Sequence, residues 1–169
     1  MIKNLIIFIT IALISGCSTL KVSTDYDPSV NIAAKSSFSI IHKSSTNSIV
    51  EDRINLAIKT NLEAKGYKEV SKEKADFDVI YEYGSKNKTD VESNFVPIGM
   101  FGGYTTVDTY HYTQGTFDIR MIDKTSKKAI WTASAQNQLS KQKTPQERTK
   151  YVNEIVTNIL EKFPSKVQK

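Results

Sequence analysis

The chain has 169 residues, 39% hydrophobic and 24% charged, with 7 Gly and 4 Pro, which suits one globular domain and excludes disordered, collagen-like and multi-spanning membrane proteins. The net charge is +5, but all except three of the 23 basic residues are lysine and they are scattered, so base recognition by arginine and a nucleic-acid partner are not expected. One cysteine excludes an internal disulfide, and with two histidines it leaves little material for a metal site.

The first residues have the pattern of a secretory signal peptide. Lys3 supplies a positive charge, residues 5–14 form an apolar run with one threonine, and the small residues Ser15 and Gly16 follow. This run is half the length of about 20 residues that a membrane-spanning helix needs. We therefore expect residues 1–16 to be a signal peptide that is removed.

The only cysteine, Cys17, follows this segment directly. The sequence from Ile14 to Cys17 resembles the lipobox of bacterial lipoproteins, in which the signal is cut before the cysteine, here between Gly16 and Cys17, and the cysteine is acylated. The resemblance implies a lipidated tether over residues 17–21 that carries palmitate-type chains. It also implies a bacterial envelope protein on the periplasmic side of the outer membrane, since Ser18 permits that location. The alternative is an ordinary signal peptide followed by an unpaired cysteine.

The next elements are two strands and an amphipathic helix. Alternation predicts a strand over residues 22–26, and a second strand is expected over residues 38–41. Ser48 and Glu51 have the spacing of a capping box at a helix start. A helix is predicted over residues 49–65, ended by Gly66. Its apolar stripe recurs every four residues and contains Val50, Ile54, Ile58 and Leu62.

A half-buried strand begins after Ala75, since apolar and polar residues alternate from there to Tyr83. Its polar face carries Asp76, Asp78 and Glu82. Paired carboxylates can perform acid–base chemistry or hold calcium, but we interpret these three as a solvated sheet face.

Residues 95–104 are rich in glycine and exposed-looking apolar residues, and they are predicted to be a loop. One interpretation is a mobile hairpin connection. The other is a contact surface for a protein partner. A pocket for a small ligand between this loop and the sheet is a further hypothesis. The candidate contact residues are Phe95, Met100, Phe101 and Tyr104.

The rest of the chain predicts three strands and a helix. Strands are expected over residues 104–113, 117–121 and 129–138, the last two joined as a hairpin, with Trp131 in the core. Thr144 and Glu147 form a second capping box before an apolar stripe that runs to Phe163. Two amphipathic helices and about five or six strands give the α+β class. We expect a two-layer sandwich of mainly antiparallel sheet in a single domain, residues 22–166.

Several segments resemble one family of bacterial lipoproteins, the domain-of-unknown-function family 4136. The resemblance is carried by residues 21–28, 51–67, 75–79, 115–131 and 162–164, in this order and spacing. It covers nearly all of the chain after the tether. The family has no assigned catalytic residues, so the resemblance implies an envelope location and a fold but no activity.

No motif predicts catalysis or a cofactor. His111 and Asp108 fall on opposite faces of their strand, so they do not form a dyad. An enzyme, for example a hydrolase acting on an envelope polymer, would require a convergent cluster of polar residues, such as Asp78, Glu82 and His111 around one cleft. We therefore expect a membrane-anchored envelope lipoprotein that is a non-enzymatic structural or interaction module with a possible envelope protein partner. The alternative is a periplasmic module that binds a small ligand, lipid or glycan.

Overall fold

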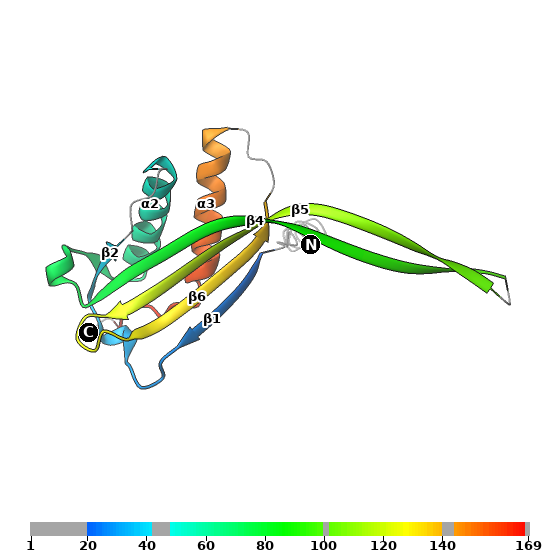
Figure 1. Ribbon diagram of the computed structural model, residues 1–169. Coiled ribbons are helices and arrows are strands. Elements are labelled where there is room, and N and C mark those ends of the chain that lie inside the picture. The colour runs from blue at the N-terminus through cyan, green and yellow to red at the C-terminus, as the bar shows by residue number, and fades with distance from the viewer. Residues whose placement is uncertain (1–19, 42–47, 100–101, 140–143, 168–169) are drawn as a thin grey trace, which may run out of the picture.

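One six-stranded sheet with two helices on one face forms the core of the protein (Figure 1). The computed structural model describes residues 20–41, 48–99, 102–139 and 144–167. The strand order across the sheet is β1-β6-β5-β4-β2-β3. The elements are β1 (Lys21–Tyr26), η1 (Ile32–Ala34), β2 (Ser37–Ile41), α2 (Ser48–Ala64), β3 (Lys68–Glu69), η2 (Lys72–Lys74), β4 (Phe77–Ile98), β5 (Gly102–Asp123), β6 (Ala129–Gln138) and α3 (Pro145–Leu160).

The sheet is mixed, with its antiparallel part on one side. Strands β1, β6, β5 and β4 pair antiparallel, whereas β2 pairs parallel with both β4 and β3. The parallel pairs follow from α2, which carries the chain back from the end of β2 so that β3 and β4 start at the same end. The predicted α+β sandwich of a mainly antiparallel sheet and two helices is confirmed.

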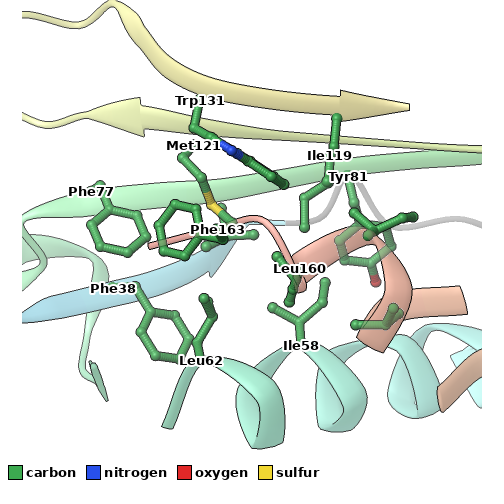
Figure 2. Close-up of a cluster of buried hydrophobic side chains, with 14 of the residues drawn as sticks. Phe38, Ile58, Leu62, Phe77, Tyr81, Ile119, Met121, Trp131, Leu160 and Phe163 are labelled. Carbon is green, nitrogen blue, oxygen red and sulfur yellow. The ribbon is translucent and has the colours of Figure 1, made fainter. Parts of the chain in front are cut away.

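The core lies between the helices and one face of the sheet. Alternation along β4 turns Phe77, Val79 and Tyr81 toward the helices, where all three are buried. Phe163, just beyond α3, packs with ring centroids 5.1 Å from Trp131 and 6.0 Å from Phe77 (Figure 2). The prediction that Trp131 belongs to the core is confirmed.

The glycine cap after α2 and the capping box before α3 are as the sequence predicts. Gly66 follows α2 with φ of +91°, the left-handed conformation of a helix C-terminal cap. At α3, the Thr144 hydroxyl accepts from the Glu147 amide at 3.2 Å, and the Glu147 carboxylate accepts from the Thr144 amide at 2.9 Å. This second capping box is confirmed. Helix α2 starts at Ser48 itself, so the predicted start is one residue late.

The prediction of a loop over residues 95–104 is wrong for residues 95–98 and 102–104, which are strand, whereas residues 100–101 lie outside the described residues. Strands β4 and β5 have 22 residues each and pair without interruption from Phe77 opposite Asp123 to Ile98 opposite Gly102. Figure 1 shows this hairpin projecting far beyond the sheet. The strands predicted over 104–113 and 117–121 are one continuous strand. Glycine and proline near the tip suggested a loop, but proline is tolerated in an edge strand because its missing N–H faces no partner.

Candidate functional site

The projecting part of the hairpin, residues 85–98 and 102–113, is called the arm here. Its 14 residues in β4 span roughly 45 Å at about 3.3 Å per residue. Strand β6 pairs with β5 only from Gln114 onward, and β2 pairs with β4 only as far as Ile80. Within the described residues, no third strand covers either edge of the arm. At the base of the arm the Thr113 carbonyl accepts from the Leu139 amide at 2.8 Å. Beyond that point, both edges present backbone N–H and C=O groups for pairing with another chain.

The arm also exposes large apolar side chains on both of its faces. Residues that pair across β4 and β5 lie on the same face of the ribbon. The alternation that turns Phe77, Val79 and Tyr81 toward the helices therefore continues along the arm. Its exposed large hydrophobic residues include Val91, Phe95 and Val107 on the face continuous with the helix side, and Ile98, Tyr104 and Tyr110 on the other. The arm thus offers apolar contacts on either side of a two-stranded ribbon.

The sequence-predicted contact residues divide between the arm and segments outside the described residues. Phe95 and Tyr104 are 66% and 52% exposed. Phe95 pairs with Thr105, whereas Tyr104 pairs with Val96, so the two rings lie on opposite faces. Met100 and Phe101, like Gly16 and Cys17, lie outside the described residues.

Phe95 has a structural role within the arm as well. A Cβ atom added at Gly103 would lie 2.3 Å from the Phe95 ring and 2.6 Å from the Val96 carbonyl oxygen. The ring therefore covers the glycine diagonally across the ribbon, an arrangement that stabilises glycine in a strand. The glycine that suggested a loop is here a site of close packing.

The example set of Asp78, Glu82 and His111 does not meet in one cleft. His111 pairs with Thr89, which lies seven residues along β4 from Glu82, roughly 23 Å away. The Thr89 hydroxyl and the His111 ring nitrogen Nδ1 are 3.0 Å apart, and Glu82 accepts from Arg120 at 3.0 Å. In the described part of the chain, no three His, Cys, Asp or Glu side chains are grouped to hold a metal ion.

Asp78 differs from the solvated residue that the sequence suggested. It is 8% exposed, accepts a hydrogen bond from the Ser39 hydroxyl at 2.6 Å, and lies 3.4 Å from the Lys124 amine. Because β2 pairs beside β4, Ser39 lies directly opposite it. Asp78 therefore ties β2 to β4 and to the turn after β5.

Two further carboxylates hold the same end of the sheet together. Burial raises the pKa of Asp76, but hydrogen bonds from Ser36 and Ser37 outweigh it, so that the net pKa is lowered. An ion pair with Lys35, aided by the Ser126 amide, lowers the pKa of Asp123 to about 2. The serine and lysine partners thus stabilise the charged form of both carboxylates, which gives Asp76 and Asp123 a structural role.

An apolar pocket of about 350 Å³ lies where the arm leaves the core. It opens between the sheet and both helices, and its walls include Leu20, Phe117, Leu139, Val152 and Ile155. The hypothesis of a pocket between the sheet and residues 95–104 is wrong in its location, because those residues lie at the far end of the arm.

The chain belongs to the family described as "Domain of unknown function (DUF4136)", which matches residues 22–165. No curated protein sequence matches it. Among the described residues, no helix is long and apolar enough to cross a membrane.

Solved structures that resemble the fold include the following two. A PDZ domain protein from Parabacteroides distasonis aligns with a TM-score of 0.61 and 16% identity, over 89% of this chain and 36% of that longer chain. A PelC dodecamer from Paraburkholderia phytofirmans aligns with a TM-score of 0.54 and 10% identity, over 88% of this chain and 99% of the other. At these identities the likeness concerns the fold alone.

Proposed function

We propose that this chain is a non-enzymatic interaction module of the bacterial cell envelope, anchored by acyl groups on Cys17 to the outer membrane and facing the periplasm. The arm is the observation that carries the proposal. A two-stranded hairpin alone in water is only marginally stable. A hairpin that projects this far with exposed apolar rows is best explained by a protein that binds along it.

The arm suits binding by strand addition. A partner strand that pairs with a free edge gains main-chain hydrogen bonds, and the alternate side chains supply specificity. On the face with Tyr104 and Tyr110, the aromatic rings give a partner large apolar contacts with polar ends.

Anchor and arm leave the core from the same end. Lys21 at the start of β1 pairs with Gln136, near the point where β6 stops pairing with β5 and the arm begins. Lys21 is the fourth residue after Cys17, so the chain between them reaches at most about 14 Å. A lipid on Cys17 would therefore hold the base of the arm close to the membrane surface.

The anchor is tested by changing Cys17 to Ala, with Ser18 to Ala as the matched control. Cys17→Ala should accumulate as an uncleaved precursor or leave the membrane fraction, whereas Ser18→Ala should remain acylated and membrane-bound. Mass spectrometry of the mature N-terminus gives the readout. A cleaved Cys17→Ala chain that still partitions into membranes would refute the anchor.

The arm is tested by photo-crosslinking in intact cells. A photoreactive amino acid replaces Tyr110 on the arm, which is 52% exposed. In the control it replaces Tyr26 on β1, which is 63% exposed and therefore at least as accessible. We expect one reproducible crosslinked protein from Tyr110 and none from Tyr26. Equal products from both positions would contradict binding through the arm.

The mass of the crosslinked product, read from a gel, distinguishes two kinds of partner. The similar PelC structure is described as a dodecamer, so self-association of this chain is one outcome, seen as adducts at multiples of its own mass. A different protein gives adducts of another mass. In either case the arm remains the binding element.

A further inference from the structure

We propose that the pocket at the base of the arm binds an acyl chain that carries an anionic head group. Its volume of about 350 Å³ falls in the range of small-molecule sites. The side chains that surround it come from the sheet, from α2 and from α3, and most of them are apolar. Such a lining removes methylene groups from water, which is the main driving force for binding a hydrocarbon chain.

Charge in the pocket has one sign. Two of the three arginines of the chain line it, Arg53 from α2 and Arg148 from α3, whereas no Asp or Glu is among the lining residues that the structure describes. The Arg53 Nε donates to the Thr149 hydroxyl at 3.0 Å. This bond uses one of five guanidinium donors and fixes the side chain between the two helices. Guanidinium groups bind carboxylates and phosphates through paired hydrogen bonds.

One apolar wall of the pocket is the side chain of Leu139, which packs closely against Gly115. A Cβ atom added at Gly115 would lie 2.6 Å from a methyl group of Leu139, so Leu139 lies directly over the glycine on the helix side of the sheet. Leu139 thereby closes the side where β6 stops pairing with β5. The hydrocarbon chain would lie between Leu139, Phe117 and α3, with its charged group at the arginines.

The membrane is the source that this location suggests. Leu20 lines the pocket, and it is three residues after Cys17. The assignment of membrane lipid as the source rests on the proposed anchor, whereas the pocket and its ligand chemistry do not. The ligand is either a free fatty acid or a single-chain phospholipid, and both present an acyl chain with an anion.

The test labels the full-length chain with a photoreactive hexadecanoate, in whichever cell fraction holds the chain. After illumination, mass spectrometry maps the labelled peptides. We expect labels on pocket-lining segments of α3 and β6. Unlabelled hexadecanoate should compete about tenfold better than hexadecanol, because hydrogen bonds to the charged head are lost with the alcohol. Each methylene removed from the competitor should weaken it by about fourfold.

Variants of the pocket distinguish specific labelling of the pocket from nonspecific labelling of the protein surface. Val152→Trp fills the half-buried wall and should abolish specific labelling, and the double change Arg53→Gln with Arg148→Gln should reduce it about tenfold. Arg120→Gln is the matched control, since Arg120 pairs with Glu82 on the outer face of the sheet, and it should label normally. Lysophosphatidylglycerol and lysophosphatidylcholine as competitors distinguish the phospholipid source, and the first should compete better.

Three results would overturn the proposal. They are labelling spread over the whole surface, equal competition by hexadecanoate and hexadecanol, and unchanged labelling in the arginine double variant. The arginine variants keep the test decisive if Val152→Trp does not fold. Because labelling is read in any fraction, a chain that is not membrane-bound would refute the anchor without deciding the pocket.

Discussion

Two phenylalanines at opposite extremes of burial test which part of the chain holds the fold. Phe163 is 1% exposed among Trp131, Phe77 and Tyr67, whereas Phe95 lies on the exposed arm. We expect Phe163→Ala to lower the free energy of unfolding by about 3–5 kcal/mol, because it leaves a cavity. Phe95→Ala should change it by less than about 0.5 kcal/mol. Denaturant unfolding of a chain that starts at Ser18 measures both, and a large loss from Phe95→Ala would mean that the arm supports the core.

Asp123 makes the stability depend on pH in the acid range. Its folded pKa of about 2 lies below the ordinary 3.8, mainly because of Lys35. A depressed carboxyl pKa gives stability that is present above the unfolded value and is lost as the pH falls from about 5 toward 2. At about 1.4 kcal/mol per pKa unit, this contribution is about 2 kcal/mol at neutral pH.

The variant Asp123→Asn isolates this effect. Its free energy of unfolding should be about 2 kcal/mol lower than that of the unchanged chain at pH 7. The difference should shrink toward zero as the pH approaches 2. Unfolding curves at several pH values give the comparison, and a difference that stays constant between pH 7 and pH 2 would show that the carboxylate charge contributes nothing.

At the scale of elements, the capping box of α3 is the clearest local determinant. Thr144→Ala removes the acceptor for the Glu147 amide and should lower the free energy of unfolding by about 1 kcal/mol. Thr157→Ala is the control, since Thr157 is exposed within the same helix, and alanine there should be neutral or slightly stabilising. Equal losses from both changes would mean that the cap is not the cause.

Local patterns predicted the helices and the sheet core well, for physical reasons that these elements show. The stripe of α2 and the alternation from Phe77 to Tyr81 are set by burial against a neighbour, so they appear as periodicity. Capping and the terminating Gly66 depend on a few adjacent residues. Each of these signals is local. The capping box of α3 and the cap at Gly66 are confirmed, whereas Ser48 is the first residue of α2 and not the residue before it.

The length of the arm and the pocket could not be predicted in the same way, although the strand over residues 104–113 was expected and forms part of β5. Along the arm both faces are exposed, so no burial pattern distinguishes strand from loop, and Gly99, Gly102 and Gly103 suggested a break. Pairing at a distance, from Val96 opposite Tyr104 to Thr89 opposite His111, decides the conformation instead. Arg53 and Arg148 line the same pocket because α2 packs against α3. The spacing of residues in the sequence does not reveal this packing.

At the scale of the whole molecule, core and arm should be separable. The core keeps its helices, its ring cluster and the carboxylates at the far end of the sheet when the arm is absent, because those contacts lie outside residues 85–113. Replacing residues 86–114 by Asn-Gly joins β4 to β5 through a two-residue turn of the type that hairpins prefer. The melting temperature of this short-arm chain should stay within a few degrees of the original.

The most direct test of the central claim compares the full chain and the short-arm chain, both with Cys17, by chemical crosslinking in intact cells followed by mass spectrometry. If the arm is the binding element, the full chain captures a reproducible partner or further copies of itself, and the short-arm chain, folded and equally abundant in membranes, captures neither. Capture of the same partner at the same yield by the short-arm chain would contradict the account.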